Sequence, residues 1–140
     1  NLRSFLKGII KHDIKFIVAT AGLKDTAEEL LTRDFPNEVK QLKEQNLISV
    51  NGNYLTYDKD GFSNGYNKGK IITTWNKHEI SLQLEQKFLY DKSHYIMIGD
   101  HIWDGHCLDG FSNIKQKFKI GLCNITEKEL NNRNSDNIEK

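Results

Sequence analysis

Apolar residues recur along the chain at two spacings, one typical of helices and one typical of strands. The first ten residues carry five apolar side chains at intervals of three and four, which predicts an N-terminal helix. These side chains are Leu2, Phe5, Leu6, Ile9 and Ile10. The next apolar run, Ile14 to Val18, is rich in β-branched residues and is bounded by Gly22. It predicts a buried strand.

A second helix is predicted over Asp25 to Arg33. The segment Asp-Thr-Ala-Glu-Glu at residues 25–29 contains two overlapping capping boxes, and Pro36 closes the segment. The elements expected next are a short polar helix (Glu38–Gln45), two strands (Leu47–Val50 and Tyr54–Tyr57) separated by Asn51-Gly52-Asn53, and a turn-rich stretch (Asp58–Gly69).

The second half continues the alternation of strands and helices. Further strands are predicted at Ile71–Trp75, Tyr95–Ile98 and Phe118–Leu122, and Ile80, Leu84 and Phe88 form the apolar stripe of a helix. This order predicts a single α/β domain whose sheet has parallel strands covered on both faces. The polar residues 131–140 are expected to be a frayed end or to stop short of a further element.

The composition removes several classes of protein. The formal net charge of +1 gives no electrostatic basis for binding nucleic acid or an anionic membrane. No apolar run approaches the ~20 residues that a bilayer span needs. Cys107 and Cys123 lack the spacing of a zinc site or a disulfide framework. They are expected to be buried thiols in a reducing compartment, so the predicted location is the cytoplasm.

In open α/β sheets, ligands bind beyond the carboxyl ends of the strands, and two of these ends carry phosphate-binding chemistry. Thr20-Ala21-Gly22 follows the first strand and precedes a helix, so a hydroxyl, free N–H groups and a helix dipole meet there. The alternative is a simple turn. Asn76-Lys77 follows the strand at Ile71–Trp75, and an ammonium there would neutralise phosphate charge; the alternative is a surface lysine.

The third strand end that carries candidate functional residues is acidic. Gly99-Asp100 follows Tyr95–Ile98, and Asp104 lies four residues later. Gly99 is expected to let the backbone turn so that both carboxylates face one cation. Hard oxygen ligands suit Mg²⁺, which keeps waters and bridges to phosphate. The alternative is that Asp100 or Asp104 is the N-cap of a following helix. His101 and His106 are expected to be structural or surface groups.

A threonine, a lysine and a Gly-Asp-x-x-x-Asp pair, in that order, resemble the second, third and fourth motifs of the haloacid dehalogenase phosphatase superfamily. More narrowly, the chain is similar to the cytosolic type III pyrimidine 5′-nucleotidases, whose motifs read Ser-Ala-Gly, Phe-Asn-Lys-His-Asp and Gly-Asp-Ser-x-Gly-Asp. The matching segments are Thr20-Ala21-Gly22, Trp75-Asn76-Lys77-His78-Glu79 and Gly99-Asp100-His101-Ile102-Trp103-Asp104. The likeness extends to the opening Leu2-Arg3 helix and to residues 49–58. Thr20 keeps the hydroxyl of the family's serine, whereas His101 and Trp103 depart from the acidic motif.

The resemblance implies a Rossmann-like, haloacid dehalogenase-type three-layer sandwich with a β-hairpin region. Residues 1–140 would form the C-terminal part of its core domain. The family's Asp-x-Asp-x-Thr motif, which supplies the nucleophilic aspartate, has no match here, and neither has the helical cap. Both are expected upstream of Asn1, so this chain alone is expected to be inactive.

By the same resemblance, the complete protein would be a Mg²⁺-dependent, cytoplasmic and monomeric phosphatase. It would hydrolyse nucleoside 5′-monophosphates, with pyrimidines preferred, through an aspartyl-phosphate. Thr20 and the N–H groups of Ala21 and Gly22 would hold phosphate oxygens, and Lys77 would offset negative charge. Asp100 would bind Mg²⁺ directly, with Asp104 in contact directly or through water.

Three other interpretations stay open from the sequence. The first is a non-catalytic, nucleotidase-like scaffold that keeps the phosphate pocket but acts as a binding protein. The second is a receiver-type signalling domain, which also places Asp, Thr and Lys at strand ends but in another order. The third is a generic α/β domain whose motifs are only caps and turns, which requires three coincidences at strand ends.

Overall fold

The computed structural model describes residues 1–66, 71–79, 88–89, 91–109, 111–112 and 114–122. The elements in chain order are α1 (Leu2–Lys11), β1 (Phe16–Leu23), α2 (Lys24–Asp34), α3 (Pro36–Glu44), β2 (Ile48–Asn53), β3 (Leu55–Tyr57), β4 (Ser63–Tyr66), β5 (His94–Gly99), the 3₁₀-helix η1 (Ile102–His106) and β6 (Gln116–Gly121). Most of the helix predicted from Ile80, Leu84 and Phe88 lies outside the described residues, as do Cys123 and residues 131–140.

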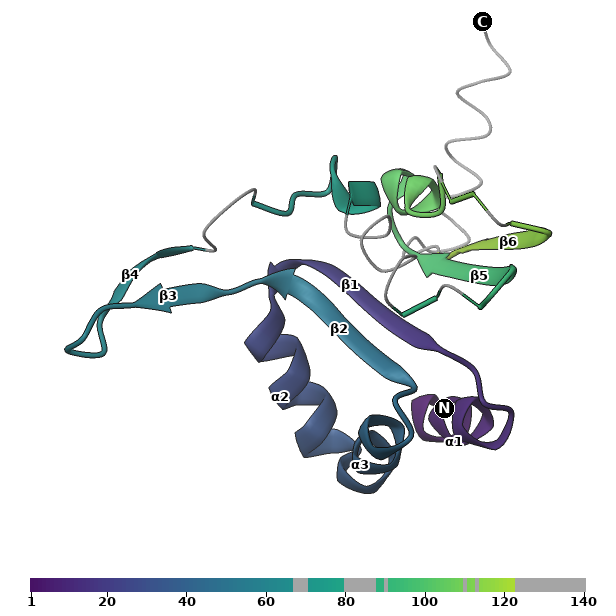
Figure 1. Cartoon of the computed structure of the whole chain (residues 1–140), viewed down its shortest axis with the longest axis horizontal. Coiled ribbons are helices and arrows are strands. Elements are labelled where there is room, and N and C mark those ends of the chain that lie inside the picture. The colour runs from purple at the N-terminus through teal and green to yellow at the C-terminus, as the bar shows by residue number, and fades with distance from the viewer. Residues whose placement is uncertain (67–70, 80–87, 90, 110, 113, 123–140) are drawn as a thin grey trace, which may run out of the picture.

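Within the described residues, the strands form three two-stranded sheets (Figure 1). β1 pairs with β2 and β5 pairs with β6, both in parallel, whereas β3 and β4 form an antiparallel hairpin. Parallel pairs require crossover connections, and α2 and α3 supply the one between β1 and β2. The predicted α/β class with parallel strands is therefore confirmed.

Strand β1 lies between two hydrophobic cores, because successive side chains of a strand point to opposite faces. On one face, Phe16 packs against a core of Leu6, Ile9, Leu42 and Leu47. On the other face, Ile17 packs against a core of Leu89, Tyr95 and Leu108. Figure 1 shows α1, α2 and α3 on one side of the β1–β2 pair and β5, β6 and η1 on the other. The helices α1 to α3 and the β5–β6 pair therefore both pack against β1.

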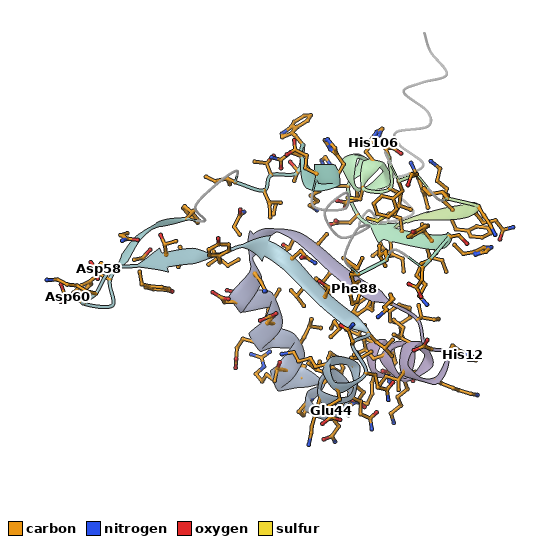
Figure 2. All side chains as sticks on the ribbon, in the orientation of Figure 1. His12, Glu44, Asp58, Asp60, Phe88 and His106 are labelled. Atoms are coloured by element: carbon orange, nitrogen blue, oxygen red, sulfur yellow. The ribbon has the colours of Figure 1, made fainter. Side chains whose placement is uncertain are left out.

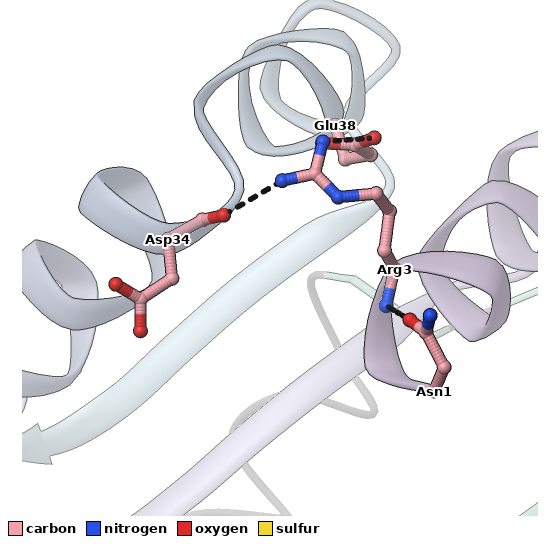
Figure 3. Close-up of polar contacts among 4 residues, drawn as sticks. All are labelled: Asn1, Arg3, Asp34 and Glu38. Atoms are coloured by element: carbon pink, nitrogen blue, oxygen red, sulfur yellow. Dashed lines mark hydrogen bonds and ion pairs between the residues drawn. The ribbon is translucent and has the colours of Figure 1, made fainter.

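Arg3 ties the three helices together at the N-terminal end (Figure 3). Its guanidinium donates to the buried Glu38 carboxylate at 3.2 Å and to the Asp34 carbonyl at 2.9 Å. The side chain of Asn1 accepts the N–H of Arg3 and caps α1.

Among the described residues, no helix is long and apolar enough to cross a bilayer.

The start of α2 differs from the prediction. The helix begins at Lys24, its N-cap position is Leu23, and no side chain caps it, so the predicted capping boxes do not form. The reason is that β1 continues through Thr20, Ala21 and Gly22 to Leu23 and passes directly into the helix. Asp25 then lies in the first turn, where its charge still favours the helix dipole.

Two sequence predictions in the middle of the chain differ from the structure. Asn51-Gly52-Asn53 does not interrupt a strand, because β2 runs through to Asn53. Ile71–Trp75 is not a strand: residues 71–73 are irregular and 74–76 form a turn. The Asn53 side chain accepts the N–H of Ile72 and donates to the carbonyl of Ile72, at 2.8 Å each. Side-chain hydrogen bonds therefore replace the expected ladder.

The β3–β4 hairpin projects from the rest of the molecule (Figure 1). Its connection is organised by Asp58, whose carboxylate accepts the N–H groups of Asp60 and Phe62, and by Gly61 at φ +84°. Figure 2 shows Asp58 and Asp60 at the tip, well separated from His106. The turn-rich stretch predicted from Asp58 therefore contains β4, and its residues 67–69 lie outside the described part.

One face of the β5–β6 pair is apolar and exposed. Paired positions Ile96 and Phe118 are 67% and 61% exposed. Ile98, Ile120 and Leu122 continue the same exposed stripe. The described helices α2 and α3 pack on β1 and β2, and α1 packs on α3, so they cover the other sheet.

Candidate active site

The predicted phosphate-binding segment lies at the carboxyl end of β1. The N–H of Gly22 donates to the Thr20 hydroxyl at 3.0 Å, in the part of β1 where the register with β2 shifts between Ala19 and Leu23. β2 approaches this segment closely at Gly52. A Cβ at that position would lie 2.7 Å from the Thr20 methyl and 3.0 Å from the Gly22 carbonyl. Glycine at position 52 thus lets β2 lie against the segment.

The predicted acidic motif follows β5. Asp104 lies in η1, and its carboxylate accepts the N–H of His101 at 3.1 Å. A Cβ at Gly99 would lie 2.4 Å from the Asp104 Cβ. Gly99 has no positive φ and belongs to β5, so its function is not to turn the chain. Glycine is required there because the Asp104 side chain occupies the space.

Lys77 and Asp104, predicted from two separate motifs, meet in the structure. The Lys77 ammonium donates to the second carboxylate oxygen of Asp104 at 2.7 Å, and the two side chains are 14% and 8% exposed. Burial disfavours the charged carboxylate, but the hydrogen bonds from Lys77 and His101 outweigh it and lower the pKa of Asp104. The structure therefore contains an ionised, largely buried ion pair at this edge.

The remaining acidic residue, Asp100, is exposed directly after β5. Asp100 and Asp104 supply carboxylate oxygens, the ligand type that Mg²⁺ prefers, and Mg²⁺ needs only one or two protein carboxylates besides phosphate and water. The donor chemistry thus fits the ion. Across the described residues, no group of three or more His, Cys, Asp or Glu is arranged to hold a metal. A metal role for Asp100 and Asp104 stays a prediction.

The histidines and the cysteine of this region have other contacts. His106 pairs with Asp109 at 2.6 Å on the surface, and this hydrogen bond lowers the pKa of Asp109. Cys107 is buried, and burial raises the pKa of its thiol. The expectation of a buried thiol is confirmed for Cys107, and that of a surface group for His106.

Two asparagines near the site were not singled out from the sequence. Asn53 is buried and connects Ala21, in the phosphate-binding segment, to Ile72. Asn76 accepts the N–H of Thr73 and donates to the carbonyl of Ile71, which shapes the turn before Lys77. The signal for Asn53 was a polar amide next to a glycine at the end of an apolar strand.

Comparisons with known proteins show the family of the chain. Over residues 1–138 the chain matches the family described as pyrimidine 5′-nucleotidase (UMPH-1). The chain belongs to that family. It is 28% identical to the 7-methylguanosine phosphate-specific 5′-nucleotidases of Mus musculus and of Homo sapiens, over 98% of this chain and 44% of theirs. The chain thus spans less than half the length of these curated relatives.

A solved structure has the same fold. Cytosolic 5′-nucleotidase IIIB, in a crystal structure bound to cytidine, superposes with a TM-score of 0.72 at 23% identity. The match covers 95% of this chain and 43% of that one. It confirms the predicted Rossmann-like α/β fold of haloacid dehalogenase type.

Proposed function

We propose that the full-length protein is a Mg²⁺-dependent 5′-nucleotidase which releases phosphate from nucleoside 5′-monophosphates through an aspartyl-phosphate. The observation that carries the proposal is the buried pair of Lys77 and Asp104, contributed by two motifs 27 residues apart and located at the end of β5. An ammonium held in a site of low exposure stabilises charge that develops on a transferring phosphoryl group. The nucleophilic aspartate would come from a segment outside residues 1–140.

Each of the predicted residues has a distinct task in this reaction. The Thr20 hydroxyl accepts the N–H of Gly22 through a lone pair, so its hydrogen stays available to donate to a phosphate oxygen. Backbone N–H groups of Ala21 and Gly22 would complete the phosphate-binding segment. Lys77 would neutralise charge on the phosphoryl group and on the nucleophile.

Asp100 and Asp104 would serve the metal differently. Asp100 is exposed and would bind Mg²⁺ directly. Asp104 already accepts hydrogen bonds from Lys77 and His101, so it would contact the ion directly or through water while holding the lysine. Mg²⁺ supplies charge neutralisation at the phosphate when bound.

The substrate base is proposed from the family. The family is described by its action on pyrimidine nucleotides, whereas the curated mouse and human relatives are named for 7-methylguanosine phosphate. We propose a pyrimidine nucleoside 5′-monophosphate as the preferred substrate. The enzyme would act as a cytoplasmic monomer.

The test is phosphate release by the full-length protein from cytidine, uridine, 7-methylguanosine and adenosine 5′-monophosphates, with cytidine 3′-monophosphate as the control. We expect Mg²⁺-dependent turnover of the pyrimidine 5′-monophosphates, its loss in EDTA and its return with excess Mg²⁺. Preference for 7-methylguanosine 5′-monophosphate would contradict the proposed pyrimidine base but would still support the proposed 5′-nucleotidase reaction. Phosphate binding without turnover of any compound would favour the non-catalytic scaffold.

A further inference from the structure

Asn53 connects two segments that are distant in sequence. Its amide nitrogen donates at 2.8 Å to the carbonyl of Ala21, which is 32 residues away, and to the carbonyl of Ile72, which is 19 residues away. Its amide oxygen accepts the N–H of Ile72, also at 2.8 Å. The side chain is 4% exposed, so these bonds form away from competing water.

This pattern requires an asparagine. A primary amide offers two N–H donors and a carbonyl acceptor on one planar group, which matches two carbonyls and one N–H. An aspartate would turn a carboxylate oxygen toward two carbonyl oxygens, and a glutamine would be longer by one methylene. Because the bonds join backbone atoms, they fix where the two segments lie.

Both segments lead to predicted site residues. Ala21 lies between Thr20 and Gly22, in the phosphate-binding segment. Ile72 precedes Thr73, whose backbone nitrogen donates to the Asn76 amide oxygen at 2.6 Å. Lys77 follows directly and binds Asp104. Hydrogen bonds, together with the short backbone segment 72–77, thus connect the end of β1 to η1.

We propose that Asn53 is a positioning residue that fixes the phosphate-binding segment relative to the Lys77 ammonium. The inference rests on the proposed function, since it concerns how one phosphate meets both groups. A phosphoryl group must contact the N–H groups and the ammonium at the same time, and a displacement of about 1 Å costs on the order of 100-fold in rate. Asn53 sets that spacing and does not itself contact substrate.

The test uses full-length protein with Asn53→Asp and, as the matched control, Asn51→Asp. Asn51 lies in the same strand and donates to Ser49, not to the site. We expect Asn53→Asp to lower kcat and to raise the inhibition constant of inorganic phosphate, each by about tenfold or more. Asn51→Asp should change neither quantity more than about twofold. Partial unfolding would lower the apparent kcat but leave the phosphate constant unchanged, so the second readout reports position.

An unchanged phosphate inhibition constant in folded Asn53→Asp would overturn the proposal. If Asn53→Asp does not fold, Asn76→Ala decides. That variant removes the bonds of the turn before Lys77 and should lower kcat by about tenfold, whereas a wild-type kcat would overturn the inference.

Hydrogen–deuterium exchange separates this inference from the proposed function. If the wild-type protein hydrolyses no nucleotide, the proposed function fails, yet the connection through Asn53 is still testable. In Asn53→Asp, residues 20–24 and 71–79 should both exchange faster than in wild type, whereas Asn51→Asp should leave both unchanged. Unchanged exchange at 71–79 in Asn53→Asp would overturn the connection.

Discussion

At the scale of single residues, the ion pair between Lys77 and Asp104 stabilises the candidate site. Replacing Asp104 with Asn keeps the shape but removes the negative charge from a lysine that is 14% exposed. We expect Asp104→Asn to lower the free energy of unfolding at pH 7 by about 2 kcal/mol. Urea denaturation of the full-length protein measures this. Asp60→Asn at the hairpin tip is the control and should have no measurable effect.

The same pair predicts a pH dependence. The pKa of Asp104 is lowered from its ordinary 3.8 in the folded state, so the ionised carboxylate stabilises the fold at pH values above 3.8. That stabilisation is lost as the pH falls through the lowered folded-state pKa. The difference in unfolding free energy between wild type and Asp104→Asn should therefore shrink below about pH 4. A difference that stays constant down to pH 3 would contradict the assignment.

At the scale of elements, Arg3 is a polar contact that joins α1 to α2 and α3. The Glu38 carboxylate that it binds is 5% exposed, so removing the guanidinium leaves a buried charge without that partner. We expect Arg3→Met to lower the free energy of unfolding by about 2 kcal/mol. The matched control is Arg33→Met, because Arg33 pairs with Asp34 on the surface, at 63% exposure. Equal effects of the two substitutions would contradict this role of Arg3.

Elements with a clear hydrophobic period were predictable from the sequence. The helix predicted from Leu2 to Ile10 and the strands predicted to begin at Tyr95 and Phe118 all form, with bounds within one or two residues of the predicted ranges. The segment Ile71–Trp75 was not predictable in this way. Its β-branched run is typical of a strand, but Asn53, which is 19 residues from Ile72, and Asn76, which directly follows the run, satisfy its backbone groups. A propensity argument does not contain such tertiary hydrogen bonds.

The candidate site was predictable in part for a related reason. Lys77, Asp100 and Asp104 each follow an apolar run, although the run before Lys77 does not form a strand, and their order along the chain is that of the family motifs. Motif order therefore indicated that these groups belong together. The pairing of Lys77 with Asp104 depends on η1, and the joining role of Asn53 depends on β2 reaching beyond its apolar residues. Neither has a periodic signal.

At the scale of the whole molecule, the two hydrophobic cores pack on opposite faces of β1. They position the two parts of the candidate site, which are the segment at residues 20–22 and the acidic motif. Ile17 packs against the core that contains Tyr95, and the Lys15 ammonium lies 4.6 Å from the ring centre of Phe88. Figure 2 shows Phe88 beside β1. Because the predicted phosphate-binding segment ends β1 and the acidic motif follows β5, the packing of these strands determines how the two parts of the candidate site face one another.

The most direct test of the central claim is phosphate release by full-length Lys77→Met under saturating pyrimidine nucleoside 5′-monophosphate and Mg²⁺. We expect kcat to fall by on the order of 1,000-fold, because the ammonium stabilises charge in the transition state. Lys40→Met is the control, since Lys40 is 74% exposed and lies in α3. It should keep the wild-type kcat. A Lys77→Met protein that is folded and retains wild-type kcat would contradict the proposed catalytic role of this lysine and the site built around it.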